Sequence, residues 1–251
     1  MDAGLTPLPP FPWGRAVRQW WRESLRERGV WRTLEEAGVQ GFNLLRDYMP
    51  ARRRLRYGDI DFDCDFGVDT TWANVTLGTR LREILAGRQY QPTDPPLFRE
   101  IITGLEIEYP EFTFVDLGSG KGRGLLLASE FPFRRIVGVE LLPELHAIAQ
   151  QNVRKFTSPA QRCNTFELWC GDARQFTFPP EPSVIFMFDP FSGHVLREVL
   201  ANLGRSVEQR PRELIVIYQN PVQEEAFIKA APFLKKTAGT IQYALFRNGQ
   251  T

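Results

Sequence analysis

Three glycines stand within five positions, at Gly118, Gly120 and Gly122, just after an apolar run that contains Asp116. Glycine adopts backbone conformations that other residues avoid, and it lets a ligand come close to the main chain. The run F-V-D-L-G-S-G-K-G-R therefore predicts a turn that wraps its backbone around a charged small molecule.

Two loops of nucleotide-binding proteins do not match this run. A P-loop has glycine where Val115 stands, and serine or threonine where Gly122 stands. A dinucleotide-binding loop has its third glycine at the position of Arg123. Asp116, at the predicted end of the strand, would repel a pyrophosphate, whereas it suits a cationic group of a ligand.

Acidic residues also stand where the next strands are predicted to end. Glu140 follows Gly120 by 20 residues, and a carboxylate there can accept hydrogen bonds from the ribose of NAD or of any other adenosine ligand. Asp172, within Gly171-Asp172-Ala173, could accept from an adenine amino group. Asp189-Pro190-Phe191 follows the next strand. Because open α/β sheets bind ligands at the carboxyl ends of their strands, these residues are predicted to share one site.

Helix and strand signals alternate along the part of the chain that must position these residues. Strands are expected at 112–117, 135–140, 166–170, 184–189, 213–218, 233–237 and 240–247, and helices at 96–106, 122–130, 143–156, 194–207 and 222–231. This alternation predicts βαβ units and a mostly parallel sheet with both faces covered. The last two strands are joined by a short turn, so they should be antiparallel.

In this order the motifs resemble those of class I S-adenosylmethionine-dependent methyltransferases. The resemblance covers about residues 90–247 and is carried by Asp116–Gly122, Glu140, Gly171–Ala173 and Asp189–Phe191. It implies an α/β fold with a doubly wound, Rossmann-like sheet of seven strands in the order 3-2-1-4-5-7-6, strand 7 being antiparallel.

The resemblance also implies S-adenosyl-L-methionine as the methyl donor, with no metal. Asp116 and the loop from Gly118 to Gly122 would hold its methionine part, Glu140 its ribose, and Leu141 would pack on its adenine. Asp172 and Ala173 would cap the edge of the adenine. The full set of implied donor-binding residues is Asp116, Leu117, Gly118, Ser119, Gly120, Gly122, Glu140, Leu141, Gly171, Asp172, Ala173, Tyr90 and Thr93.

The acceptor side is less sharply defined by the sequence. Asp189, Pro190 and Phe191 stand where nitrogen methyltransferases often carry [DN]-P-P-[FYW], and this implies a catalytic role or contact with an amine; a strand-ending turn is the alternative. Tyr90 and Thr93, ahead of the glycine loop, give a further resemblance to seven-strand protein lysine methyltransferases. It implies that both residues line the donor pocket. The interpretation favours a nitrogen nucleophile. The acceptors considered are a protein lysine and a small-molecule amine or hydroxyl.

The N-terminal region is expected to comprise a disordered tail at 1–12 and a mainly helical cap at 13–90, ahead of the methyltransferase domain at 91–251. Asp59, Asp61, Asp63 and Asp65 alternate with apolar residues. This period of two predicts a strand with four carboxylates on one face, or else a solvated loop, and the carboxylates could meet a metal or a basic substrate. Lys121 is expected to face solvent or to start a helix.

Composition narrows the classes of partner. The chain has 251 residues and a net charge of +1, so no overall field draws it to nucleic acid or to a membrane. Protein side chains or small molecules are therefore favoured over RNA as acceptors, and the oligomeric state stays open. Three cysteines without a C-x-x-C pair, and prolines in place of an apolar signal segment, predict a cytoplasmic protein. A non-catalytic module that binds the donor, or an NAD-dependent oxidoreductase, are the alternative functions.

Overall fold

The computed structural model describes residues 60–71, 92–191 and 193–249, and isolated positions between 18 and 38. The chain divides into two compact units: Met1–Tyr57 with Val75–Gln89, and Gly58–Asn74 with Tyr90–Thr251. The second unit contains the sheet. It also contains residues 58–74, which were predicted to belong to the N-terminal cap.

Little of the predicted N-terminal region lies within the described residues. Arg18, Leu25, Trp31 and Leu34 lie in helical segments. The predicted tail at 1–12 and most of the predicted cap at 13–90 lie outside the described part of the chain, so their structure stays a prediction.

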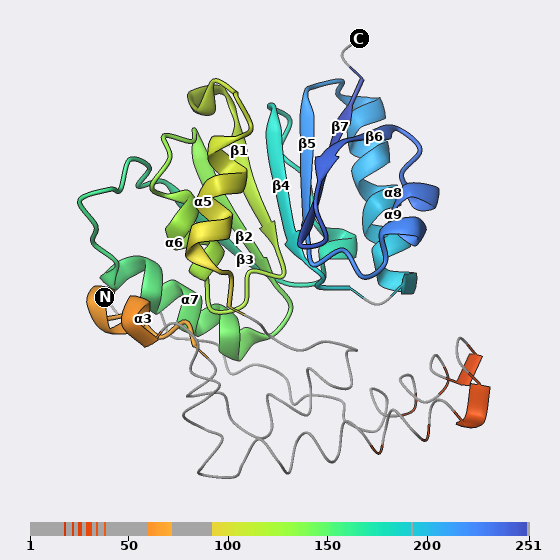
Figure 1. Cartoon of the computed structure of the whole chain (residues 1–251), viewed down its shortest axis with the longest axis horizontal. Helices are drawn as coiled ribbons and strands as arrows, with labels where there is room; N and C mark the ends of the chain where they lie inside the picture. The colour runs from red at the N-terminus through yellow and green to blue at the C-terminus, as the bar shows by residue number, and fades with distance from the viewer. Residues whose placement is uncertain are drawn as a thin grey trace. The chain divides into compact units, whose positions relative to one another are not determined.

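Within the described residues, seven strands form one sheet in the order β3-β2-β1-β4-β5-β7-β6 (Figure 1). The strands are β1 Thr113–Leu117, β2 Arg135–Glu140, β3 Phe166–Cys170, β4 Ser183–Phe188, β5 Leu214–Gln219, β6 Leu234–Gly239 and β7 Tyr243–Asn248. β7 is antiparallel to both β5 and β6, and the other pairs are parallel. The predicted fold is confirmed. The strand order reverses between β1 and β4, which is where such sheets bind ligands.

Helices cover both faces of this sheet (Figure 1). One face carries α5 (Pro95–Thr103), α6 (Arg123–Ala128) and α7 (Pro143–Lys155), and the other carries α8 (Gly193–Gln209) and α9 (Glu224–Ala230). Two 3-10 turns, η3 (Tyr109–Glu111) and η4 (Ala173–Gln175), join strands to their neighbours.

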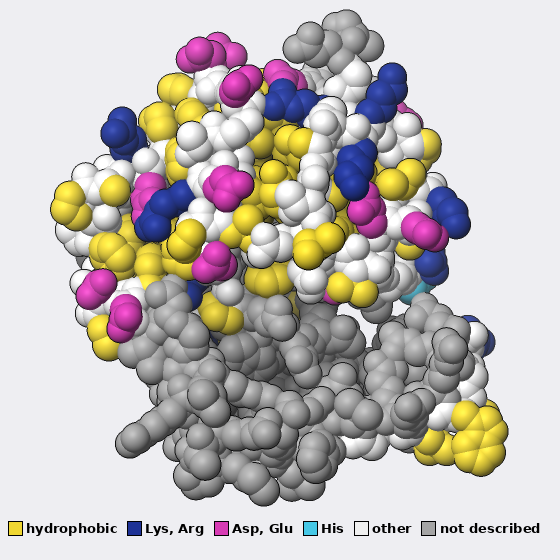
Figure 2. All heavy atoms as spheres, viewed as in Figure 1, with side chains coloured by type: hydrophobic (Ala, Val, Ile, Leu, Met, Phe, Trp, Pro, Cys, Tyr) yellow, Lys and Arg dark blue, Asp and Glu magenta, His cyan; other side chains and the backbone are white. Residues whose placement is uncertain are grey.

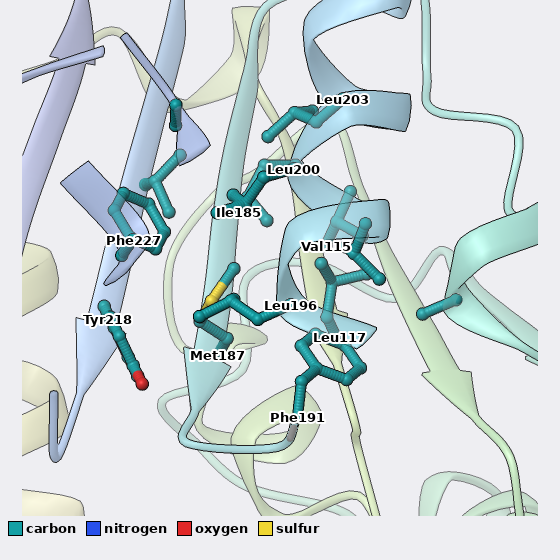
Figure 3. Close-up of a cluster of buried hydrophobic side chains, with 14 of the residues drawn as sticks. Val115, Leu117, Ile185, Met187, Phe191, Leu196, Leu200, Leu203, Tyr218 and Phe227 are labelled. Atoms are coloured by element: carbon teal, nitrogen blue, oxygen red, sulfur yellow. The ribbon is translucent and has the colours of Figure 1, made fainter. Parts of the chain in front are cut away.

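The sheet forms because its central strands are apolar on both faces. In β1, Val115 and Leu117 pack toward α8, as Figure 3 shows, whereas Phe114 packs with Phe98 of α5 on the opposite face. In α8, buried side chains recur at helical spacing and form one apolar stripe: Leu196, Val199, Leu200 and Leu203. Burying each such side chain contributes roughly 1.5–3 kcal/mol, so the packed faces hold the strand ends in fixed positions.

The acidic row before the sheet is a helix, not the strand that the period of two predicted. α3 spans Ile60–Phe66. Phe62 and Phe66, four residues apart, have ring centroids 4.9 Å from each other, and both rings contact Phe156 at the end of α7. Phe62 and Phe66 fit the alternation of period two as well as a spacing of four, and the spacing of four places both rings on one face of a helix.

The surface of the described unit carries both signs of charge. On the face that Figure 2 shows, acidic and basic side chains are interspersed among apolar and neutral ones. No helix among the described residues has both the length and the apolar character needed to cross a membrane.

Candidate active site

The glycine loop between β1 and α6 takes a conformation that requires glycine. Gly118, Gly120 and Gly122 have φ values of +85°, +54° and +89°, in the left-handed region that costs other residues about 1–2 kcal/mol. The amides of Gly118 and Ser119 donate to the Val139 carbonyl at 2.8 and 3.0 Å. The loop is therefore pinned to the end of β2.

Gly118 also brings the loop against the segment that follows β4. A Cβ atom at Gly118 would lie 2.6 Å from the Cβ of Pro190, well inside contact distance. The β1 and β4 loops therefore touch at the switch point of the sheet. This brings together two motifs that lie far apart in the sequence and that the resemblance assigns to one site.

Glu140, at the end of β2, is held by two backbone amides. Its Oε2 accepts from the Gly120 amide at 2.8 Å, and its Oε1 accepts from the Leu142 amide at 2.7 Å. These two bonds fix the orientation of the carboxylate. The side chain is 5% exposed.

Asp116 is buried at the end of β1, on the face covered by α6. A Cβ atom at Gly124 of that helix would lie 2.5 Å from its Oδ2, so only glycine leaves room for the carboxylate. Burial, with the nearby Glu140 carboxylate adding to it, raises the pKa of Asp116 to about 8. Among the described residues, no hydrogen bond to this carboxylate is found.

Asp172, after β3, was expected to contact adenine, but its carboxylate is engaged by a neighbouring arginine. Asp172 caps η4 and forms an ion pair with Arg174, whose Nε lies 2.9 Å from its Oδ2. Both oxygens of Asp172 thus already accept from Arg174. The Gly171 amide donates to the Glu140 carbonyl at 2.9 Å, which ties this loop to β2. Leu141, next to Glu140, leaves an apolar side chain 37% exposed.

Asp189 and Tyr218 form a polar pair at the ends of β4 and β5. The Tyr218 hydroxyl donates to Oδ1 of Asp189 at 2.6 Å. Burial raises the pKa of Asp189, and the hydrogen bonds from Tyr218 and Gln223 oppose that rise. Asp189 has φ +38°, a strained value for a residue other than glycine, and such values concentrate at functional sites.

The other predicted site residues have mainly structural surroundings. Phe191 is 4% exposed and lies in the core cluster of Figure 3, close to Leu117 and Met187. Thr93 is buried just before Asp94, whose side chain caps α5 by accepting from the Leu97 amide. Tyr90 lies outside the described residues.

The expectation that Lys121 faces solvent is wrong. Its side chain is fully buried, and Nζ donates to Asp69 Oδ1 and to the Thr71 carbonyl, both at 2.7 Å. Arg123 is buried as well. The signal in the sequence for these contacts is the presence of two cations, Lys121 and Arg123, in the glycine loop, together with the acidic residues upstream.

No family model matches this chain, and no curated protein matches it. Among solved structures it is similar to a predicted N6-adenine-specific DNA methylase from Listeria monocytogenes, with 15% identity and a TM-score of 0.48, over 65% of this chain and 53% of that one. The chain thus spans about half the length of the Listeria protein.

Two further solved structures show a similar level of likeness. An RNA methyltransferase from Salinibacter ruber, in complex with S-adenosyl-L-homocysteine, is 18% identical with a TM-score of 0.42, over 62% of this chain and 92% of its own. A SAM-dependent methyltransferase from Leishmania major is 10% identical with a TM-score of 0.45, over 62% and 70%. The strand order of this chain defines its fold.

Proposed function

We propose that this chain is a class I S-adenosylmethionine-dependent methyltransferase. The observation that carries the proposal is a pair of buried carboxylates, Asp116 and Glu140, at the ends of adjacent strands beside a loop of left-handed glycines. This arrangement calls for a ligand that is cationic near Asp116 and that offers hydroxyl groups near Glu140.

The residues fit the methyl donor on electrostatic grounds. Without a cation beside it, Asp116 has a pKa of about 8 and holds a proton through most of the neutral range. A ligand ammonium at this point would favour the ionised carboxylate, because opposite charges stabilise each other strongly in a buried site. A pyrophosphate would add negative charge beside two carboxylates, and this disfavours NAD.

The ribose and adenine contacts that the resemblance implies fall on Glu140, Leu141 and Asp172. Glu140, which the Gly120 and Leu142 amides orient, presents a carboxylate, and a carboxylate is a suitable acceptor for hydrogen bonds from ribose hydroxyls. Leu141 exposes an apolar surface beside it that suits an adenine ring. Asp172 could reach the adenine edge only by sharing its oxygens with Arg174.

The bound donor would supply an electrophilic methyl group on a sulfonium, with a neutral thioether as the leaving group. The protein then has to orient the acceptor and remove its proton, and positioning of this kind supplies most of the rate enhancement. Asp189 is the proposed base or orienting group. The raised pKa of its carboxyl makes it a better proton acceptor than an exposed aspartate. A nitrogen nucleophile, on a protein lysine or a small molecule, is the favoured acceptor.

Titration calorimetry with S-adenosylhomocysteine and with NADH tests the donor assignment. We expect S-adenosylhomocysteine to bind and NADH not to bind. Glu140→Ala should weaken the binding of S-adenosylhomocysteine strongly, whereas Glu167→Ala, at an exposed ion pair on β3, should leave it unchanged. Failure of the wild-type protein to bind S-adenosylhomocysteine at millimolar concentration would refute the proposal, and binding of NADH alone would indicate an oxidoreductase.

Transfer of the methyl group needs a separate measurement. The protein is incubated with tritiated S-adenosylmethionine and cell extract, and the label is followed into protein, RNA and small molecules. We expect label in protein or in small molecules. If the donor binds and no fraction is labelled, the chain is a non-catalytic binding module.

A further inference from the structure

Lys121 sits in the middle of the glycine loop with its charge buried. Its ammonium donates to the Asp69 carboxylate and to the Thr71 carbonyl, both at 2.7 Å. Burying a charge costs several kcal/mol unless it is paired and hydrogen-bonded. Asp69 and Thr71 therefore offset the cost of burying the Lys121 ammonium, which belongs to the glycine loop.

Arg123, two residues further on, reaches the same segment. Its Nε donates to Thr70 Oγ1 at 2.6 Å, one guanidinium nitrogen lies 3.2 Å from Asp63 Oδ1, and the guanidinium stands 4.9 Å from the centre of the Phe62 ring. The side chain is 2% exposed. Asp63 in turn accepts from the amides of Thr70 and Thr71, both at 2.8 Å, so one carboxylate orders the turn that meets both cations.

Asn152 of α7 closes this set of contacts. Its Nδ2 donates to the carbonyls of both Asp69 and Lys121 at 2.8 Å, and its Oδ1 accepts from the Asp69 amide at 2.9 Å. The α3 segment, defined as residues 60–71, is thus bonded to the glycine loop directly and through α7. In Figure 1, α3 lies beside α7.

The same loop bears the groups proposed to hold the donor. Lys121 lies between Gly120, whose amide orients Glu140, and Gly122, whose amide donates to the Ser119 carbonyl at 2.8 Å. A shift of Lys121 would move both neighbours, because consecutive residues share rigid peptide planes. The orientation of the Glu140 carboxylate would change with them.

We propose that the α3 segment positions the glycine loop for the methyl donor, through the ion pairs of Asp69 with Lys121 and of Asp63 with Arg123. These four are positioning residues, and the inference rests on the proposed function. The chain enters this part of the sheet unit from Met1–Tyr57 and returns to Val75–Gln89. The N-terminal unit is therefore joined covalently to both ends of the element that holds the loop.

The test compares Asp69→Asn with the double variant Asp69→Asn/Lys121→Met. The single variant leaves a buried ammonium without its carboxylate, so it should lower both stability and affinity. The double variant removes both charges, which commonly restores stability. We expect S-adenosylhomocysteine to bind on the order of 10-fold more weakly to both variants, measured by calorimetry on protein shown to be folded by circular dichroism. Amide exchange in residues 118–123 should be faster in both.

Glu181→Gln is the matched control. Glu181 pairs with Arg135 at 2.6 Å, at the start of β2 and away from the carboxyl ends of the strands. This change should leave affinity and loop exchange unaltered. Wild-type affinity in folded Asp69→Asn, or affinity that returns together with stability in the double variant, would overturn the positioning role. If the wild-type protein itself does not bind S-adenosylhomocysteine, the proposed function fails instead.

Discussion

Asp116 is buried near a second carboxylate, Glu140, and both features raise its pKa. The raised pKa makes the stability of the protein depend on pH, which can be measured. The value of about 8 in the folded chain compares with 3.8 for an unperturbed aspartate. The folded state thus holds the proton more tightly than the unfolded state. The contribution of protonated Asp116 to the free energy of unfolding is fully present below about pH 4, and it is lost as the pH rises through about 8.

Asp116→Asn should therefore stabilise the free protein at high pH while weakening the proposed site. We expect a gain of a few kcal/mol in the free energy of unfolding at about pH 9, and little change at about pH 4, measured by urea unfolding. S-adenosylhomocysteine binding should fall strongly at every pH. Equal stability of variant and wild type at about pH 9 would contradict the raised pKa.

Tyr218 is one of two residues whose hydrogen bonds lower the pKa of Asp189 against the effect of burial. Its hydroxyl donates to the Asp189 carboxylate, and this hydrogen bond favours the ionised form. Tyr218→Phe should raise the pKa of Asp189 further. Because a general base must be ionised, the acidic limb of the methyl-transfer rate should move up by about one pH unit, since a lost hydrogen bond to a charged group is worth roughly 1.5 kcal/mol.

Label transfer from tritiated donor, followed over a range of pH, measures this shift. Tyr109→Phe is the control, because it loses a hydroxyl bond of 2.8 Å to the Ile102 carbonyl and has no contact with Asp189. A profile that is the same in Tyr218→Phe and in the wild type would show that Asp189 does not act as the base.

At the scale of elements, the contact between the β1 and β4 loops can be tested through Gly118. Gly118→Ala adds left-handed strain and a Cβ atom 2.6 Å from Pro190. We expect a loss of roughly 2–5 kcal/mol in the free energy of unfolding, together with weaker binding of S-adenosylhomocysteine. Urea unfolding and calorimetry measure the two effects.

Gly67→Ala is the matched control for this substitution. Gly67 has φ +62°, but nothing lies within 4 Å of an added Cβ. Only the backbone strain remains, so the loss in the free energy of unfolding should be about 1–2 kcal/mol. Equal losses at Gly67 and Gly118 would mean that Pro190 does not restrain the loop.

At the scale of the whole molecule, the balance of charge bears on the class of acceptor. The chain has 31 basic and 30 acidic residues. Non-specific affinity for nucleic acid comes from neutralising phosphates, so we expect duplex RNA to bind no more tightly than about 10⁻⁴ M near physiological salt. Fluorescence anisotropy at several salt concentrations tests this. Tight binding that weakens steeply with salt would point to a nucleic-acid acceptor.

The sequence by itself determined the sheet. Buried strands such as Ser183–Phe188 are continuous apolar runs, and helices such as Gly193–Gln209 repeat apolar residues at helical spacing, so each element is encoded locally. The resemblance of the strand-end motifs to those of class I methyltransferases implied the strand order. The grouping of Asp116, Glu140 and Asp189 at one edge was predicted because parallel strands share their carboxyl ends.

Tertiary structure decided what those residues touch. Lys121 meets Asp69 across 52 residues of chain, Arg123 meets Asp63 across 60, and Tyr218 meets Asp189 across 29. No local pattern encodes such pairs, because they form only when separate elements pack together. The same holds for α3. Its alternating aspartates predicted a strand, but in the folded chain Phe62 and Phe66 pack against Phe156, and this packing favours a helix.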